Sequence, residues 1–127
     1  AINTFPRTGM TFMALLHIKN GVSATDIKVE LLDGLLALAV VFHLAEQLLV
    51  ITALRDGTHK PLSLHYRGYA ADLRARHIPK DHLGPLLEKM KAALGPKFQI
   101  LLEYNKEGVP HYHVEYDPYN DGGKTLP

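Results

Sequence analysis

The sequence predicts an α+β fold in a single domain, with an antiparallel-rich mixed sheet whose helices pack on one face. Three observations lead to this prediction. The 127 residues are enough for one hydrophobic core and too few for two comfortable ones. Two segments carry helix signals, and four short apolar segments between turn signals favour strands. Together these elements predict one compact domain in which strands outnumber helices.

Residues 27 to 46 form the strongest predicted helix. Ser23, Thr25 and Asp26 offer N-caps, and apolar residues follow at helical spacing at positions 27, 31, 32, 35, 38, 39 and 42. Residues 48 to 54 are predicted to form a buried strand, which ends at the turn signal of residues 55 to 57. Before the helix, residues 1 to 10 show no clear period, and the apolar run of residues 12 to 18 fits an edge strand or a helical turn.

The second half of the chain predicts a strand, a helix and two further strands. Residues 69 to 73 favour a strand, and residues 81 to 94 a helix that ends at Gly95-Pro96. Residues 98 to 104 and 111 to 116 favour strands joined by a turn, and the odd-numbered side chains of the last strand share one face. Residues 118 to 127, like residues 1 to 10, are expected to be irregular or mobile.

Composition excludes several classes of function. The 14 basic residues nearly cancel the 13 acidic ones, so we expect no nucleic acid partner. The longest apolar run, Leu35 to Leu44, is well short of the roughly 20 residues that a membrane span needs, so we expect no membrane partner. Cysteine is absent, and any metal must therefore be bound by histidine and carboxylate. The eight histidines indicate metal or acid-base chemistry.

A histidine and a carboxylate lie seven residues apart in the segment Ser-Leu-His-Tyr-Arg-Gly-Tyr-Ala-Ala-Asp, which runs from Ser63 to Asp72. Gly68 stands between them and can fold the loop back, so that His65 and Asp72 reach one ion. Mixed histidine and carboxylate ligands suit zinc. Ala70 shares the face of Asp72 on a strand, and its small side chain leaves room beside a metal.

Two further histidines, His111 and His113, lie two residues apart on the predicted last strand, so both imidazoles project from one face. With His65 and Asp72, His113 completes three protein ligands and leaves the fourth tetrahedral position open, as in catalytic zinc sites. Zinc lowers the pKa of bound water toward about 7, and a nearby carboxylate can then serve as general base. Glu107 is the predicted base, and His111 is the predicted catalytic helper.

The pattern Ser-Leu-His-Tyr-x-Gly-x-Ala-x-Asp resembles the zinc-site signature of the family that unites bacterial zinc D-Ala-D-Ala peptidases, phage endolysin peptidases and the hedgehog signalling domain. Downstream, Glu107-Gly-Val-Pro-His111-Tyr-His113 resembles the end of the hedgehog motif, where the last histidine ligates zinc and the glutamate contacts zinc-bound water. The resemblance covers residues 48 to 117. It implies the hedgehog/DD-peptidase fold, with one Zn²⁺ per chain in a groove on the sheet face opposite the helices.

The same resemblance suggests roles for two upstream residues. His59 lies six residues before His65, as a non-ligand histidine does beside the hedgehog zinc, and Arg55 is placed like the arginine that many bacterial peptidases aim at substrate. One position departs from the family pattern. Bacterial members commonly carry the acidic base three residues before the final histidine ligand, where this chain has Pro110. Either Glu107 takes over that role or catalysis is impaired.

These patterns predict a zinc metallopeptidase that hydrolyses amide bonds of peptidoglycan stem peptides. By resemblance it acts on the bacterial cell wall, as a phage endolysin or a bacterial carboxypeptidase does, and we expect a monomer. Two alternatives stay open. One is a non-hydrolytic zinc module that binds a peptide or protein, suggested by Pro110, because hedgehog keeps the metal without an established hydrolytic role. The other is a virion component that carries this domain.

Each assignment competes with a simpler structural explanation. For the three predicted ligands, the alternative is a loop ion pair and a packed strand histidine. For Glu107 it is a solvated turn residue, with Glu103 on the preceding strand as a rival base. His111 could merely support the residues around the metal, and His59 and Arg55 could be loop residues that make no contact with substrate. The histidines outside the motifs are expected to be structural or exposed: His17, His43, His77 and His82.

Overall fold

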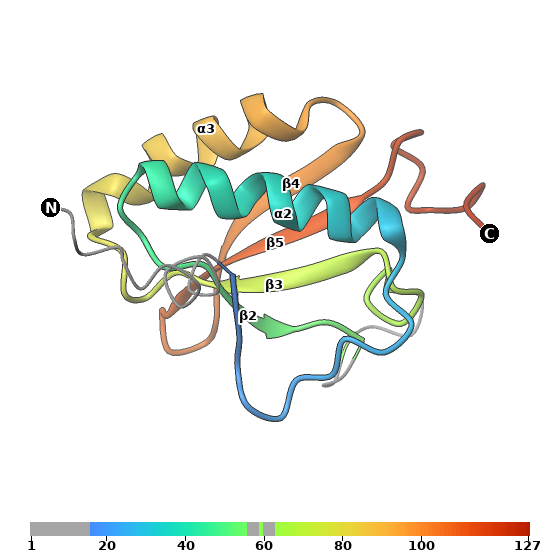
Figure 1. Ribbon diagram of the computed structural model, residues 1–127, viewed down its shortest axis with the longest axis horizontal. Helices are drawn as coiled ribbons and strands as arrows, with labels where there is room; N and C mark the ends of the chain where they lie inside the picture. The colour runs from blue at the N-terminus through green and yellow to red at the C-terminus, as the bar shows by residue number, and fades with distance from the viewer. Residues whose placement is uncertain (1–15, 56–58, 60–62) are drawn as a thin grey trace, which may run out of the picture.

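A five-stranded mixed sheet forms the centre of the computed structural model, which describes residues 16–55, 59 and 63–127 (Figure 1). The strand order is β1-β2-β3-β5-β4. The strands span β1 His17–Ile18, β2 Val50–Ala53, β3 Ala70–Arg74, β4 Phe98–Tyr104 and β5 Pro110–Tyr116. The short β1 pairs in parallel with β2, and the other neighbours pair antiparallel. The chain is therefore an α+β domain with an antiparallel-rich mixed sheet, as the sequence predicted.

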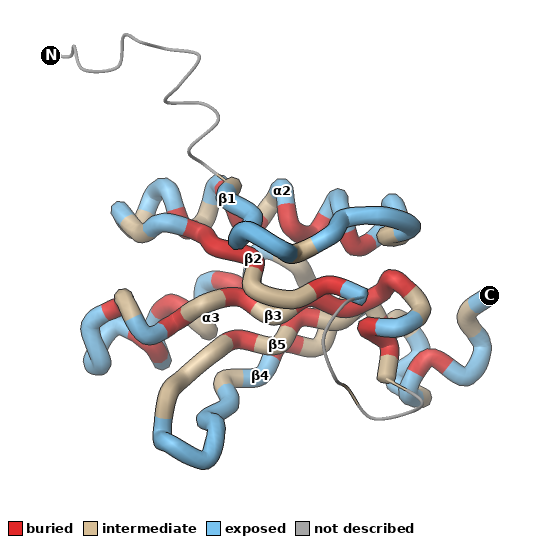
Figure 2. Tube along the Cα trace, turned by 90° about the horizontal axis from the view of Figure 1, so that it is seen from below, coloured by how far each residue is buried: buried red, intermediate tan, exposed pale blue. Residues whose placement is uncertain are grey.

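Two helices, α2 (Val29–Leu44) and α3 (Leu83–Leu94), lie side by side on one face of this sheet, and the 3₁₀ turn η1 (Lys80–His82) leads into α3 (Figure 1). One core joins the helices to the sheet, and Figure 2 shows its buried stretches in red. Each large apolar side chain that is fully buried contributes about 1.5 to 3 kcal/mol. Within the described residues, no helix combines the length and apolar character that crossing a membrane requires.

The alternation of side chains divides the sheet into a core face and an open face. Leu73, Tyr112 and Val114 point into the core, which they share with the buried side chains of α2. Those side chains are Leu31, Leu35, Leu38, Ala39 and Phe42. Because successive strand residues point to opposite faces, the residues between those core positions project away from the helices. The open face is thus left for polar side chains.

The element bounds agree with the sequence prediction to within about two residues. The helix predicted over residues 27 to 46 begins at Val29 and ends at Leu44, because Glu46 adopts a positive φ of 59°. Leu32, which belonged to the predicted apolar stripe, is 39% exposed, since the helix turns it toward solvent. Of the predicted run 12 to 18, residues 17 and 18 form the edge strand β1, while residues 12 to 15 and 1 to 10 lie outside the described residues.

The C-terminal segment has no helix or strand after β5, but hydrogen bonds hold it. Asp117 is buried, and its carboxylate accepts from the backbone N–H groups of Asp121, Gly122 and Gly123. Arg67, in the loop before β3, donates to the carbonyl of Gly123 over 2.7 Å. Residues 118 to 127 thus contain no helix or strand, and their mobility stays a prediction.

Gly68 shapes the loop that leads into β3. Its φ is +81°, and a Cβ at this position would lie 2.5 Å from the backbone oxygen of Asp26. The Gly68 N–H donates to the carbonyl of His65 over 3.1 Å, and the Lys28 N–H donates to the Gly68 carbonyl over 3.0 Å. Only glycine fits both the positive φ and this close approach, and the resulting turn brings His65 back toward Asp72.

We expect Gly68→Ala to lower the free energy of unfolding by about 2 kcal/mol or more, because a left-handed L-residue costs about 1 to 2 kcal/mol and the new Cβ also meets backbone. Urea unfolding monitored by circular dichroism measures this change. The matched control is Gly84→Ala, a helical position where an added Cβ meets nothing within 4 Å and should gain up to about 1 kcal/mol. Equal stabilities of the two variants would contradict this account of the loop.

Candidate metal centre

The open face of the sheet gathers the polar side chains that the sequence singled out. In the β3–β5 ladder Asp72 pairs with His113, and in the β4–β5 ladder Glu103 pairs with His111. Residues 111, 113 and 115 of β5 alternate with the core residues Tyr112 and Val114, so they share the face of Asp72. Strand register alone therefore places two histidines and three carboxylates on one surface.

Asp72 Oδ1 lies at the centre of this group. It is 3.1 Å from His113 Nδ1 and 3.3 Å from His65 Nε2. The His65 side chain is only 3% exposed, and the side chains of Asp72 and His113 are also largely buried, at 19% and 15% exposed. The structure thus brings together the three residues predicted as metal ligands, with two ring nitrogens directed at one oxygen.

The far nitrogen of each imidazole is held by an acceptor. His65 Nδ1 lies 2.7 Å from the carbonyl oxygen of Leu54, and a carbonyl can only accept, so Nδ1 carries a proton and Nε2 is the ring nitrogen directed at Asp72. His113 Nε2 lies 2.7 Å from Glu115 Oε1, which fixes that ring in the same way. An imidazole that donates its outer N–H to a carbonyl or carboxylate is the usual arrangement of a metal-bound histidine.

His59 adds a third imidazole. Its ring stacks on that of His65 with centroids 3.8 Å apart and an interplanar angle of 5°. Donor atoms of His59, His65 and Asp72 all lie within 4.8 Å of one another, so this group could hold a metal ion. His59 was predicted as a non-ligand neighbour of the metal. In the structure its donor atom lies close enough to those of His65 and Asp72 for His59 to be a ligand as well. His113 contacts Asp72 Oδ1.

The contacts between the rings and the carboxylate shift two pKa values. Burial alone would raise the pKa of Asp72, but hydrogen bonds from His113 and His65 outweigh it and hold that pKa well below its usual value. Burial alone would lower the pKa of His113, but hydrogen bonds to Asp72 and Glu115 outweigh it and raise that pKa to about 9. The raised pKa of His113 favours the protonated form of its ring at neutral pH.

A groove opens beside this cluster. Its volume is about 590 Å³, and it runs over the open face of β3, β4 and β5. Besides the cluster itself, Glu103, His111 and Glu115 line it. His111 Nε2 lies 3.1 Å from Glu103 Oε1, so a carboxylate and an imidazole stand together next to the candidate metal centre. This pairing can accept, hold and return a proton.

Two predicted catalytic residues lie outside the groove. Glu107 is exposed in the β4–β5 turn, beyond the end of both strands, and is not among the residues that line the cavity. Arg55 donates to the carbonyl of Tyr66 over 3.0 Å and pairs with Asp26 over 3.0 Å, and it does not line the cavity either. The long hairpin turn carries Glu107 past the site, and the ion pair with Asp26 holds Arg55 toward the start of α2.

Sequence reasoning missed two residues of this region. Glu115 was assigned no role, although its odd number on the last strand puts it on the face of His111 and His113. His77 was expected to be structural or exposed. Its ring Nδ1 accepts from Arg74 Nε over 3.2 Å, and its Nε2 lies 2.8 Å from the Leu48 carbonyl. No local pattern indicates the contact with Leu48, because it depends on how the chain leaves β3.

In metal-free protein, the raised pKa of His113 should make stability depend on pH. Its contribution is complete below about pH 6.5, the usual histidine value, and is lost as the pH rises from there to about 9. The lowered pKa of Asp72 contributes above 3.8 and is lost as the pH falls below that value. We therefore expect a stability plateau between about pH 4 and 6.5. Urea unfolding in chelator from pH 4 to 9.5 measures it.

The matched variant is His113→Gln, which keeps a polar side chain that does not titrate. It should lower stability on the plateau and flatten the decline between pH 6.5 and 9. If wild type and variant decline in parallel across that window, His113 does not hold the extra proton.

The fold and the site were also compared with known proteins. No family model, no curated protein and no solved structure matches this chain.

Proposed function

We propose that this chain is a zinc-dependent peptidase that hydrolyses amide bonds of peptidoglycan stem peptides. One observation carries the proposal: Asp72 Oδ1 faces His65 Nε2 and His113 Nδ1, and both rings are fixed from behind by Leu54 and Glu115. Such a converging set, next to a solvent-open groove, has the character of a site built for a cation and a ligand. The sequence resemblance supplies the reaction class and the substrate.

His65, Asp72 and His113 would hold the zinc. Two neutral imidazoles and one carboxylate are donors that zinc accepts, and the chain offers no thiolate. When bound, zinc supplies Lewis acidity, which polarises a carbonyl oxygen and lowers the pKa of water toward about 7. Glu115 holds the His113 ring through its outer nitrogen, and the Leu54 carbonyl does the same for His65.

Glu103 is the general base that the geometry favours. It lines the same groove as the cluster, and His111 Nε2, 3.1 Å from Glu103 Oε1, holds the carboxylate in that groove. There it can take a proton from attacking water and return it to the leaving amine, while His111 steadies the negative charge that develops. Glu107, the base expected from the motif, lies in the exposed turn outside the groove.

A second reading is a zinc module that binds a peptide without cleaving it. Pro110, which begins β5, stands where bacterial family members commonly carry their acidic base. This reading shares the metal centre with the first, and only an assay of hydrolysis separates them.

Removing a zinc ligand should abolish tight metal binding. We expect His65→Ala, Asp72→Ala and His113→Ala each to weaken zinc affinity by at least about 100-fold, because changes behind the ligands alone cost about 10- to 100-fold. Competition with a chromophoric chelator measures affinity, and elemental analysis measures zinc per chain. His82→Ala, an exposed histidine on η1, is the matched control and should bind zinc like wild type.

The same measurement on His59→Ala decides the role of the stacked ring. If the zinc affinity of this variant stays within about threefold of wild type, His59 lies beside the metal without binding it. If the affinity falls as far as in His113→Ala, His59 is a ligand. Retention of full affinity by all three predicted ligand variants would remove the metal centre from the proposal.

Glu103→Gln should lower kcat/KM by about 10²- to 10⁴-fold with zinc content unchanged, because general acid-base catalysis contributes about that much. Glu107→Gln, the isosteric control in the turn, should stay within about threefold of wild type. The assay follows new amines from purified muropeptides by mass spectrometry.

If Glu107→Gln is the inactive variant, the base is the one named by the motif. If zinc-loaded wild type releases no fragment from any wall type, hydrolysis is rejected and the binding module stands.

A further inference from the structure

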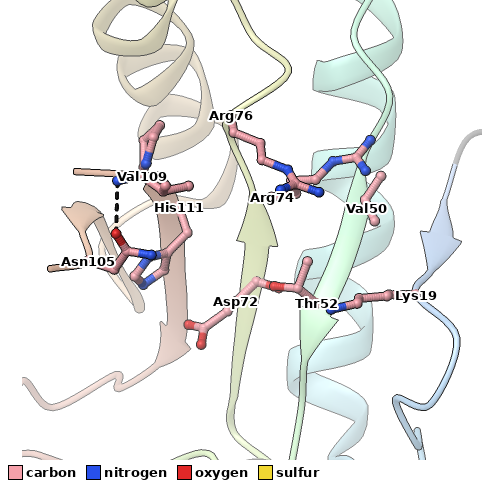
Figure 3. A pocket seen from close by; sticks show the side chains of 10 residues that line it. Lys19, Val50, Thr52, Asp72, Arg74, Arg76, Asn105, Val109 and His111 are labelled. Carbon is pink, nitrogen blue, oxygen red and sulfur yellow. Dashed lines mark hydrogen bonds between the residues drawn. The ribbon is translucent and has the colours of Figure 1, made fainter. Parts of the chain in front are cut away.

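A second cavity adjoins the groove at the candidate metal centre. Its volume is about 400 Å³, and it shares Asp72 and His111 with the groove described above. Figure 3 shows the side chains of Arg74 and Asp72 projecting from β3, with His111 on β5 to one side and Lys19 to the other. The two cavities therefore meet at Asp72 and His111, and a ligand that crosses this point would occupy both.

Three cations line this cavity, namely Lys19, Arg74 and Arg76. Asp72 is the one carboxylate among its lining residues, and it already contacts His65 and His113. In the described part of the chain, none of the three cations pairs with a carboxylate within 4.0 Å. The whole protein has a net charge of only +1, so this is a local concentration of positive charge.

Arg74 is held in place by a relay. His77 Nε2 lies 2.8 Å from the carbonyl oxygen of Leu48, so it is the protonated nitrogen, and His77 Nδ1 accepts from Arg74 Nε over 3.2 Å. Burial lowers the pKa of His77, and the charges of Arg74 and Arg76 lower it further. The Leu48 hydrogen bond opposes this shift but does not outweigh it, so the neutral form is favoured. The relay uses Nε and leaves the two terminal nitrogens of the guanidinium for another acceptor.

The walls of the cavity are partly apolar, beside the polar side chains of Thr52 and Asn105. Val50 on β2 and the pair Val109 and Pro110 at the start of β5 line it. A guanidinium fork binds a carboxylate through two parallel hydrogen bonds, and short apolar walls suit a small aliphatic group beside it. A polyanion such as nucleic acid would need charges spread along a stripe, whereas these three cations line a single cavity.

We propose that this cavity is a carboxylate-binding subsite, in which Arg74, Arg76 and Lys19 receive a free carboxylate of a peptide whose amide bond lies at the metal centre. His77 is a positioning residue for Arg74. The peptide as ligand rests on the proposed function, whereas the carboxylate preference rests on the cavity itself. Two carboxylates of a stem peptide share this chemistry: the C-terminal one and the free carboxylate of its D-glutamate.

The test measures binding rather than turnover. The probe is acetyl-L-Ala-γ-D-Glu-L-Lys-D-Ala, with two further forms in which either the C-terminal or the glutamate carboxylate is replaced by an amide. Isothermal titration calorimetry on zinc-free protein, where hydrolysis is suppressed, gives Kd, and the titrations are repeated with zinc. One of the two amidations should weaken binding by roughly 10- to 100-fold, because charge-assisted hydrogen bonds are lost. That result identifies which carboxylate enters the cavity.

Variants then locate the effect. Arg74→Gln and Arg76→Gln should each weaken binding of the free peptide by about tenfold or more and leave binding of the sensitive amide unchanged. Arg76 is exposed, so its variant is informative even if Arg74→Gln folds poorly. His77→Leu should lower the preference for carboxylate over amide, and His77→Gln, which can donate and accept, should restore it. Lys89→Gln, an exposed lysine on α3, is the matched control and should change nothing.

Equal binding of all three peptides overturns the subsite, as does an equal loss of free and amidated peptide in the arginine variants. Tighter binding of a glycerol phosphate oligomer, lost in the same variants, also overturns it in favour of a phosphate ligand. Failure of this subsite and failure of the proposed function give different results. Carboxylate-dependent binding without hydrolysis keeps the subsite and rejects the peptidase, and hydrolysis without carboxylate preference does the reverse.

Discussion

The carboxylate of Asp72 is the point on which the arrangement of this protein depends. A largely buried carboxylate must be compensated, and here two imidazoles direct nitrogens at one of its oxygens. One imidazole comes from the neighbouring strand β5 and the other from the loop that Gly68 turns back onto β3. His65 and Asp72 also belong, with His59, to the group of side chains whose donor atoms could hold a metal ion.

The helices contribute to this centre indirectly, by fixing the sheet that carries it. Residues of β3 and β5 alternate between the core beneath α2 and the open face, so a shift of one position would exchange Tyr112 and His113. Tyr112 is fully buried, and its hydroxyl donates to the Leu83 carbonyl at the start of α3 over 2.7 Å. Burial of that ring therefore secures the register in which His113 meets Asp72.

The two cavities of the open face differ in the charge of their lining residues. Glu103 and Glu115 line one cavity, Lys19, Arg74 and Arg76 line the other, and Asp72 and His111 line both. Carboxylates and cations thus lie in different cavities that meet at Asp72 and His111. In the proposed function, this asymmetry gives an extended peptide a direction, because its carboxylate and its scissile amide would occupy different cavities.

Local patterns along the chain were enough to predict the elements and to place His65 and Asp72 in one candidate site. Helical spacing predicted α2, alternation predicted β5, and the His65-to-Asp72 spacing with Gly68 predicted a shared site, because these are local properties of the chain. Tertiary structure decided what depends on register and loop path. The ladder between β4 and β5 placed Glu103 opposite His111 and left Glu107 in the turn, and the path of the chain after β3 brought His77 to the Leu48 carbonyl. Residues distant in sequence acquire neighbours only when strands pair, and no spacing along the chain encodes those contacts.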